Sequence, residues 1–549
     1  MKEMMRTKLD AALKSLARKR GWTASLDLGG YALEEPRDPA FGHLAANAAM
    51  TLAKAVGLKP RELAELIAAE IDDPEGFIES TSVEGPGFIN FRLSIKWWAR
   101  ILRNVRLAGA DYGRGAPDGR RVQVESVSAN PTGPLHVGHG RGAALGDALA
   151  RLLAFLGHEV EREYYVNDAG RQMRVLGGST LHRLRELEGR TEPEPAEFYR
   201  GEYVRDLARE LRPRLPADFG QRPQDEQTAL LSELSGQAIL AGIKADLAAF
   251  RAGHDVWFAE SSLYADGLVE EAFAELDKAG RLYRQDGALW FKTTDLGDDR
   301  DRVLVKSSGE KTYFAADLAY HQHKFRRGFD LVVDVWGADH HGYIPRMKAA
   351  VEALGARRDQ LAVVLVQLVN LLRDGKPAQM STRAGEFVTL KELVDEVGVD
   401  AARFIFLTRS CDSTLDFDLE LAKAKTRDNP VFYVQYVCAR ASSVLAKASV
   451  DGPPADLELL NTPEELELVK HLAGFPETLR AAAKRLEPCL LASWLTGLAK
   501  LFHQYYGLQR LVDEDKPALT SARLELVAAV RQTASIGLNL LGVTAPEKM

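Results

Sequence analysis

Apolar, strand-like runs alternate with helical patterns through the middle of the chain, and this alternation restricts the possible folds more than any other feature. Strand-like runs occur at 122–127, 160–166, 331–336 and 361–369. Helical apolar spacing lies between them, as in Leu145–Leu156. Because parallel strands need a long crossover, usually a helix, this order predicts an α/β domain with a Rossmann-type doubly wound parallel sheet. A charged, mostly helical stretch at about 170–300 interrupts the order and is predicted to be an insertion.

The segments on either side of this region have different patterns. Residues 1–110 combine helical periodicity with one strand-like segment, Gly87–Leu93, and a glycine-rich stretch typical of a linker begins at Ala108. After Leu419 strand signals nearly vanish and helical spacing dominates, as in an apolar stripe that starts at Val434. We therefore predict an α+β N-terminal domain (1–110), the α/β domain (111–418) and an all-α helical bundle (419–549).

Composition excludes several classes of protein. The chain has 549 residues with 71 Lys plus Arg and 78 Asp plus Glu, so a nucleic-acid partner would have to be met by a local patch of basic residues. Its three cysteines, Cys411, Cys438 and Cys489, form no CxxC pair, which indicates reduced thiols. No apolar stretch reaches the ~18 residues of a membrane helix, and Glu3 and Asp10 argue against a targeting peptide. We expect a cytoplasmic protein.

The segment Glu125–Gly140 joins the first strand of the predicted sheet to its helix. Ligands of open α/β sheets bind beyond the carboxyl ends of the strands, where the next helix directs free N–H groups at an anion. His136 and His139 lie three residues apart with glycines beside them, and can donate hydrogen bonds to a triphosphate. This segment is the candidate site of chemistry.

Other interpretations of the same segment remain open on spacing alone. Gly138, Gly140 and Gly142 do not complete GxGxxG, and no GxxxxGK[ST] is present. The two histidines could be structural, or could bind zinc with His340 and His341, although the acidic residue of an HExxH motif is missing.

Several segments together carry a specific resemblance. They are His136–His139, Tyr164–Gly170, Val335–Tyr343, Asn429–Tyr436 and Ala545–Met549. In this combination the sequence resembles arginyl-tRNA synthetases, which are class I aminoacyl-tRNA synthetases, and the likeness runs over most of the chain. His136-Val137-Gly138-His139 matches the HIGH signature of that class.

The resemblance implies a two-step ligase reaction and a set of partners. ATP, with Mg²⁺, and L-arginine would form arginyl-adenylate and pyrophosphate, and a ribose hydroxyl of the terminal adenosine of the tRNA for arginine would then accept the arginyl group. Adenylate formation would depend on bound tRNA, and the protein would be a monomer with no tightly bound cofactor and no structural metal. The ATP-binding residues implied are Ala129, Asn130, Pro131, Thr132, Gly133, Pro134, Leu135, His136, Val137, Gly138, His139, His340, Met380, Ser381 and Arg383.

The second class I signature, KMSKS, matches Gln379–Arg383, where both signature lysines are absent. Gln379 and Thr382 stand in their places, so another cation must stabilise the charge that develops on pyrophosphate. We predict Arg383, then Lys376, then Lys306 for this catalytic function, beside His136 and His139. The alternative for each cation is a solvated surface charge.

Selection of arginine needs a carboxylate, because a planar guanidinium is matched bidentately by Asp or Glu. The resemblance points to Asp317 with the Tyr313 hydroxyl for the guanidinium, and to Glu125 with Asn130 for the α-amino group. It also points to Asp339 as an arginine-binding residue. Asp317 could instead be a helix cap or part of an ion pair.

Aromatic and basic residues in the helical bundle suit contact with RNA. Tyr433, Tyr436 and Arg440 are spaced i, i+3 and i+7, and rings with a guanidinium can stack on the unstacked bases of a tRNA loop. Spacing alone equally allows a core stripe, whereas the resemblance places this block in the anticodon-binding domain. Tyr505, with its neighbour Tyr506, and Met549 are further candidates, and the N-terminal domain would contact the corner of the tRNA.

Two other functions compete with this interpretation. The altered Gln379–Arg383 segment allows a catalytically impaired relative that only binds tRNA. A metal-dependent hydrolase could use His136, His139, His340 and His341. The presence of all the implied site residues argues against the non-catalytic relative, because a scaffold has no need of a complete site; these residues are His136, His139, Glu125, Asn130 and Asp317.

Overall fold

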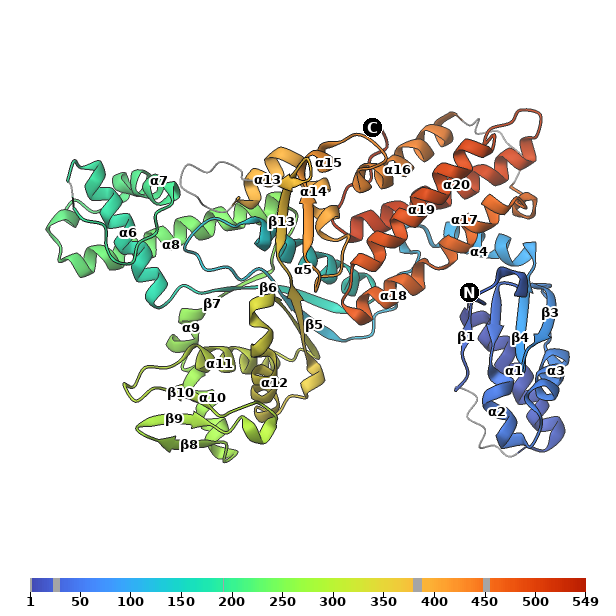
Figure 1. Ribbon diagram of the computed structural model, residues 1–549, viewed down its shortest axis with the longest axis horizontal. Coiled ribbons are helices and arrows are strands. Elements are labelled where there is room, and N and C mark those ends of the chain that lie inside the picture. The colour runs from blue at the N-terminus through green and yellow to red at the C-terminus, as the bar shows by residue number, and fades with distance from the viewer. Residues whose placement is uncertain (1, 23–29, 191, 379–387, 448–454) are drawn as a thin grey trace.

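The computed structural model describes residues 2–22, 30–190, 192–378, 388–447 and 455–549. A central sheet lies between an arm of three helices on one side and a helical bundle on the other, with the N-terminal domain below the bundle (Figure 1). Among the described residues, no helix combines the length and the apolar character needed to cross a membrane.

The N-terminal domain is an antiparallel sheet covered by helices. The sheet has the order β1-β2-β4-β3. Its strands are β1 (Leu33–Glu34), β2 (Leu44–Ala46), β3 (Ile78–Glu84) and β4 (Phe88–Leu93), and its helices are α1 (Lys2–Arg20), α2 (Ala48–Val56) and α3 (Pro60–Glu70). The α1 residues Met5, Leu9, Leu13 and Leu16 are all buried, as their spacing along one helical face requires.

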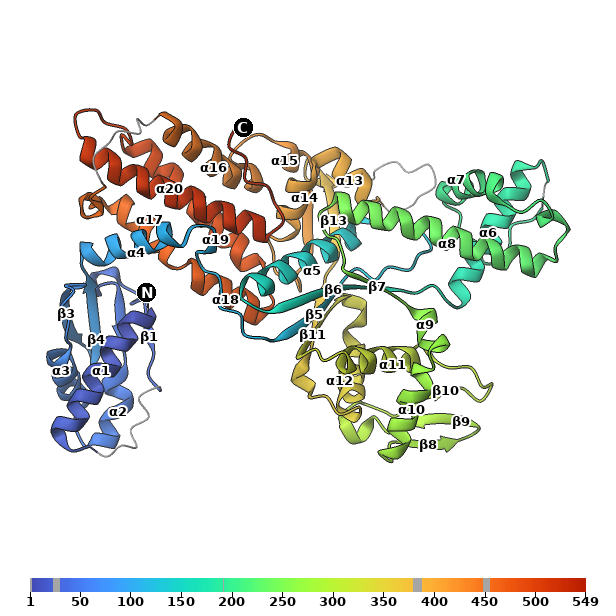
Figure 2. The same ribbon diagram turned by 180° about the vertical axis from the view of Figure 1, so that it is seen from behind.

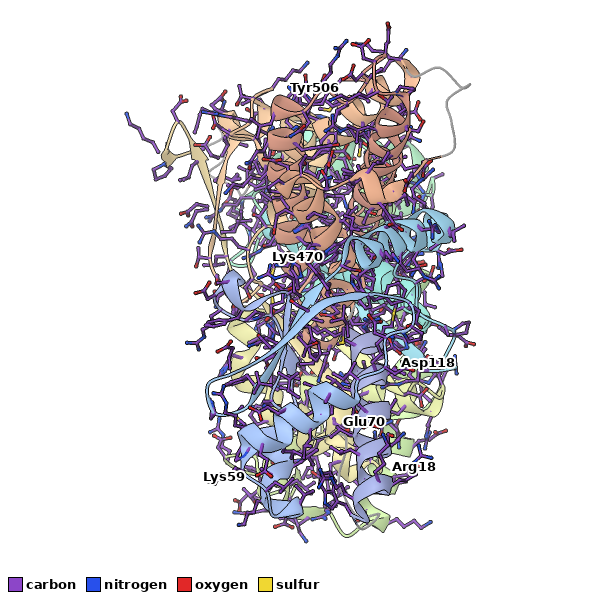
Figure 3. All side chains as sticks on the ribbon, turned by 90° about the vertical axis from the view of Figure 1, so that its right-hand side faces the viewer. Arg18, Lys59, Glu70, Asp118, Lys470 and Tyr506 are labelled. Atoms are coloured by element: carbon purple, nitrogen blue, oxygen red, sulfur yellow. The ribbon has the colours of Figure 1, made fainter. Side chains whose placement is uncertain are left out.

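Helix α4 (Ile95–Ala108) links this domain to the bundle at the C-terminal end of the chain. The Arg106 guanidinium donates to Glu525 (2.8 Å) and to Gln532 (2.9 Å). A second link is the ion pair between Lys470 and Glu35, at 3.0 Å, and Lys470 lies near the boundary of the two parts in the side view of Figure 3. The two ends of the sequence are therefore packed against each other.

The central sheet has five strands in the order β12-β11-β5-β6-β7, and every neighbouring pair is parallel. The strands are β5 (Arg121–Glu125), β6 (Glu159–Val166), β7 (Val256–Ala259), β11 (Leu331–Gly337) and β12 (Leu361–Val366). Helices α5 (Val137–Phe155), α11 (Tyr313–Arg326) and α12 (Ile344–Ala353) cross between strands. The predicted doubly wound parallel sheet is confirmed.

The stretch 170–300 is not one helical insertion. Helices α6 (Arg171–Leu187), α7 (Glu202–Leu211) and α8 (Gln224–Ala249) project from the sheet as an arm, seen from behind in Figure 2. The chain then returns to the sheet as its edge strand β7. A second excursion follows, with α9 (Glu260–Ala265), α10 (Leu268–Lys278) and the antiparallel strands β8 (Leu282–Gln285), β9 (Ala288–Phe291) and β10 (Arg302–Val305). The short run Val256–Ala259 was too brief to stand out between two long helical patterns.

A small sheet and a bundle complete the chain. The order β14-β13-β15 joins β13 (Val369–Arg373), β14 (Lys376–Pro377) and β15 (Leu415–Asp418), beside α13 (Leu390–Val397), α14 (Val399–Phe406) and α15 (Leu419–Lys423). The bundle consists of α16 (Pro430–Lys447), α17 (Pro463–Ala473), α18 (Phe475–Arg485), α19 (Cys489–Leu508) and α20 (Pro517–Leu540). The stripe that begins at Val434 is buried in α16, as predicted.

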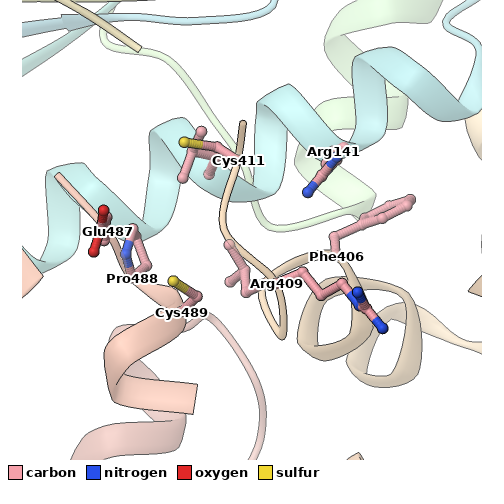
Figure 4. Close-up of a pocket in the computed structure, with 9 residues that line it drawn as sticks. Arg141, Phe406, Arg409, Cys411, Glu487, Pro488 and Cys489 are labelled. Atoms are coloured by element: carbon pink, nitrogen blue, oxygen red, sulfur yellow. The ribbon is translucent and has the colours of Figure 1, made fainter. Parts of the chain in front are cut away.

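Arg141 joins α5 to the small sheet and its loops. Its buried guanidinium donates to the carbonyl oxygens of Gln367 (2.9 Å), Ser413 (2.8 Å) and Ser410 (2.9 Å). It lines a small pocket that Cys411 and Cys489 also line (Figure 4). Both are free thiols, and burial raises their pKa. Such thiols react slowly, in agreement with the reduced cysteines predicted.

Candidate active site

The loop after β5 holds a strained backbone at the carboxyl edge of the sheet. Val127 and Ser128 have φ of +71° and +41°, in a region that a β-branched residue such as valine rarely enters. Hydrogen bonds hold this conformation: the Ser128 hydroxyl donates to Glu125 Oε1 (2.8 Å) and accepts from the Tyr165 N–H (3.1 Å). Strain of this kind is concentrated at functional sites.

His136 and His139 form a reciprocal cap at the first turn of α5. The N–H of His139 donates to His136 Nδ1 (3.3 Å), and the N–H of His136 donates to His139 Nδ1 (3.2 Å). The rings stack with their centroids 3.6 Å apart. A Cβ on Gly138 would lie 2.9 Å from the His136 ring, so a larger residue there would displace that ring. With each Nδ1 accepting, the proton of each neutral ring belongs on Nε2.

Both histidines are neutral at physiological pH. Burial lowers the pKa of His136, and burial together with the neighbouring His136 lowers the pKa of His139 to about 3. Each ring can therefore donate one hydrogen bond from Nε2 to an anion at the helix N-terminus, where the helix dipole also favours negative charge. A zinc centre is not supported, since no group of three His, Cys, Asp or Glu side chains with ligand geometry occurs in the described ranges.

The rest of the predicted ATP-binding segment, residues 129–135 and 137–138, differs in burial from residue to residue. The side chains of Ala129, Pro131, Leu135 and Val137 are buried, so these residues present mainly backbone atoms to a ligand. The Asn130 amide donates to Gln172 (2.6 Å). The Tyr203 hydroxyl donates to the Thr132 carbonyl (2.7 Å), Gly133 is half-buried and Pro134 is exposed.

The structure describes only two of the three candidate cations, Lys376 and Lys306. Met380, Ser381 and Arg383, with Gln379 and Thr382, lie outside the described residues. Residues 388–390 form backbone hydrogen bonds with residues 135–137, next to the two histidines. Val137 N–H donates to Val388 O (3.1 Å), and Leu390 N–H donates to Leu135 O (2.7 Å). Lys376 is exposed on β14, and Lys306 forms an exposed ion pair with Glu310 (2.8 Å).

Asp317 lies in the second turn of α11, so it is not a helix cap. The Tyr343 hydroxyl donates to Asp317 Oδ2 at 2.5 Å, whereas Tyr313, the predicted partner, is 68% exposed one turn away. Burial raises the pKa of Asp317, and the bond from Tyr343 opposes the rise. The carboxylate is thus half-buried and oriented by a tyrosine that the sequence argument did not assign.

Glu260 is a second carboxylate near Asp317, and the sequence argument missed it. It begins α9, directly after β7. Burial raises its pKa to about 7, helped by the negative charges of Asp317 and Asp168, while the adjacent Tyr165 hydroxyl lowers it. Two carboxylates with two tyrosine hydroxyls suit a planar cation that has several N–H donors. The position of Glu260 at the carboxyl end of β7 could not be predicted, because the run Val256–Ala259 is too short to be recognised as a strand from the sequence.

Glu125 is buried and already paired. Lys324 Nζ lies 2.5 Å from Glu125 Oε2, and the Ser128 hydroxyl occupies one side of Oε1. Burial raises the pKa of Glu125, and the positive charge of Lys324 opposes this. Asp339 lies after β11 and is exposed, with His340 Nε2 3.6 Å from its carboxylate.

In the bundle, Arg440 lies between two aromatic rings. Its guanidinium is 4.4 Å from the Tyr436 ring and 4.7 Å from the Tyr506 ring. His503 lies 3.2 Å from Arg440 and bonds to the Tyr433 carbonyl (3.0 Å). We call Tyr433, Tyr436, Arg440, His503 and Tyr506 the aromatic cluster.

The prediction that Tyr505 lies on the RNA-binding surface of the bundle is wrong. Tyr505 is fully buried and its hydroxyl donates to Glu465 (3.3 Å), so it cannot contact RNA. Its neighbour Tyr506 is 39% exposed instead, and Met549 is 52% exposed.

The parallel sheet, with His136 and His139 paired at the start of its first crossover helix, has the arrangement expected from the resemblance to class I aminoacyl-tRNA synthetases. The family model described as "tRNA synthetases class I (R), catalytic domain" matches residues 102–416. "Arginyl tRNA synthetase N terminal domain" matches 3–93, and "DALR anticodon binding domain" matches 434–549. The chain belongs to the arginyl-tRNA synthetases.

The similarity to known proteins extends over the whole chain. An arginine-tRNA ligase of Nitratidesulfovibrio vulgaris is 52% identical over 525 residues, which cover 94% of this chain and 95% of the relative. One from Desulfosudis oleivorans is 50% identical over 562 residues, with full coverage of both chains. The structure of Thermus thermophilus arginyl-tRNA synthetase superposes with a TM-score of 0.75, at 25% identity and full coverage of both chains.

Proposed function

We propose that this arginyl-tRNA synthetase joins arginine to its tRNA in two steps at the carboxyl edge of the central sheet. The arginine carboxylate attacks the α-phosphate of ATP, forming arginyl-adenylate and releasing pyrophosphate. A ribose hydroxyl of the terminal adenosine of the tRNA then attacks the activated carbonyl and displaces AMP. The neutral His136–His139 pair at the N-terminus of α5 is the observation that carries this proposal.

The two histidines stabilise charge in the first step. Negative charge accumulates on the phosphates as the bond to pyrophosphate breaks, and preorganised donors that meet this charge lower the barrier. The Nε2–H groups of His136 and His139 serve as those donors, and the positive end of the α5 helix dipole adds to their effect. ATP enters as its Mg²⁺ complex.

Asp317 and Glu260 bind the guanidinium of arginine. Their closeness and the burial of Glu260 support this assignment, because a guanidinium is among the few side-chain groups that would satisfy both carboxylates. Tyr343 orients Asp317 through its hydrogen bond, and the Tyr165 hydroxyl lies beside Glu260. Glu125, through the free side of Oε1, and Asn130 bind the α-amino group.

Arg383 supplies the cation that replaces the missing signature lysines. This remains a prediction from its place in the second signature. Lys376 and Lys306 rank below it, and the ion pair of Lys306 with Glu310 further weakens its case. An Arg383→Ala enzyme that formed adenylate at the normal rate would rule Arg383 out.

The aromatic cluster binds the anticodon loop of the tRNA. Stacking on tyrosine rings and on a guanidinium suits unpaired bases, and Tyr506 is the most exposed ring of the cluster. Met549 adds an exposed apolar side chain. The N-terminal domain contacts the corner of the tRNA. The enzyme acts as a monomer in the cytoplasm.

Exchange of pyrophosphate into ATP tests the first step. Wild-type protein with arginine and the tRNA should exchange label, and omission of the tRNA should abolish the exchange, as the family resemblance implies. If tRNA bound but neither exchange nor charging occurred, the catalytically impaired alternative would be correct.

A further inference from the structure

Helix α11 carries a polar stripe on the face that it buries against the sheet. Asp317, His321 and Lys324 are spaced i, i+4 and i+7, so they lie on one side of the helix. Lys324 is fully buried and His321 is 4% exposed. An apolar stripe is expected on such a face, and the mechanism above uses neither His321 nor Lys324.

These side chains form a continuous network of polar contacts between Glu125 and the backbone of Asp317. Lys324 Nζ lies 2.5 Å from Glu125 Oε2 and 2.8 Å from Asp334 Oδ1. Asp334 Oδ2 lies 2.8 Å from His321 Nε2, and His321 Nδ1 lies 2.7 Å from the backbone carbonyl of Asp317. Glu125 on β5 is thereby connected to the turn of α11 that carries Asp317.

Lys324 lies at the centre of this contact network, between two carboxylates and an aromatic ring. The ammonium group of Lys324 contacts both Glu125 and Asp334 and lies 4.3 Å from the centre of the Tyr320 ring. Both ring nitrogens of His321 lie within hydrogen-bond distance of oxygen atoms, one on Asp334 and one on the backbone of Asp317. Buried ion pairs of this kind rarely stabilise a fold more than apolar residues of the same volume. A function in positioning explains them better than a function in stability.

We propose that Lys324 and His321 are positioning residues that fix the separation between the two substrate-binding carboxylates, and so select the length of the amino-acid side chain. The inference rests on the proposed function, in which Glu125 binds the α-amino group and Asp317 the guanidinium. A substrate reaches both carboxylates only if the number of its methylene groups matches their separation. A rigid separation therefore discriminates between arginine and homoarginine, which has one more methylene group.

The test is the ratio of kcat/KM for arginine to kcat/KM for homoarginine, measured by pyrophosphate exchange with tRNA present. One methylene group is typically discriminated by about 10- to 200-fold. We expect His321→Gln and Lys324→Gln to lower the ratio at least about fivefold and to raise the KM for arginine, with the KM for ATP unchanged. Arg326→Gln is the matched control, because Arg326 lies on the exposed face of α11 and pairs with Glu271 and Glu275.

Thermal unfolding of each variant separates positioning from stability. If His321→Gln lowers the melting temperature but keeps the wild-type ratio, its function is structural and the inference is overturned. Should Lys324→Gln fail to fold, the ratio in His321→Gln decides alone. Failure of the wild-type enzyme to activate arginine would instead contradict the proposed function, and this outcome is visible before any variant is made.

Discussion

The pKa of Glu260 predicts how arginine binding depends on pH. Burial raises this pKa to about 7, so the free carboxyl is about one-tenth ionised at pH 6 and about nine-tenths ionised at pH 8. Only the ionised form pairs with a guanidinium. The KM for arginine should therefore be about tenfold higher at pH 6 than at pH 8, and level off above pH 8.

Pyrophosphate exchange at saturating ATP and tRNA, from pH 6 to pH 8.5, measures this dependence. His139 stays neutral throughout, because its pKa is about 3. The pKa of His136 is also lowered, which favours its neutral form. Glu260→Gln should raise the KM for arginine and flatten its pH profile, whereas the exposed control Glu271→Gln should keep both. A Glu260→Gln enzyme with the wild-type slope would refute the assignment of Glu260 to the guanidinium.

Three further variants follow from the same contacts. His139→Ala should slow adenylate formation about 10²- to 10³-fold in pyrophosphate exchange, since it removes one phosphate donor, while tRNA affinity measured by filter binding stays unchanged. Tyr436→Ala should weaken tRNA binding by about 1–3 kcal/mol, and the buried Tyr505→Phe should not; equal losses would contradict the aromatic cluster. Gly542→Ala should lower the free energy of unfolding by more than about 1 kcal/mol, because φ is +69° and the added Cβ would lie 2.2 Å from Arg403 Nη2; an unchanged denaturant midpoint would argue against this contact.

The sequence predicted the parts of the fold that depend on periodicity. The parallel sheet and the buried stripe of α16 follow from spacing that persists over many residues. Tyr505 could have been placed by the same reasoning, because Leu491, Leu495, Leu498, Phe502 and Tyr505 recur at helical intervals and all lie in the core of α19. Its assignment to the surface ignored that stripe.

Other features depend on contacts between distant segments, which spacing cannot reveal. Glu260 joins the site because the brief run Val256–Ala259 pairs with β6, and nothing local marks that run as a sheet strand. Lys324 is separated from Glu125 by 199 residues, so their contact depends on how α11 packs on β5. The strained φ of Val127 likewise has no sequence signature, since valine is the residue least expected there.

Charging of the tRNA with arginine, citrulline and lysine tests the central claim most directly. Citrulline keeps the shape of arginine but is neutral, and lysine keeps a charge without the planar fork of N–H donors. If Asp317 and Glu260 read the guanidinium, acid-precipitable label should accumulate with arginine, and kcat/KM for each analogue should be lower by several orders of magnitude. Comparable charging with citrulline would show that the two carboxylates do not select the substrate, and would contradict the account.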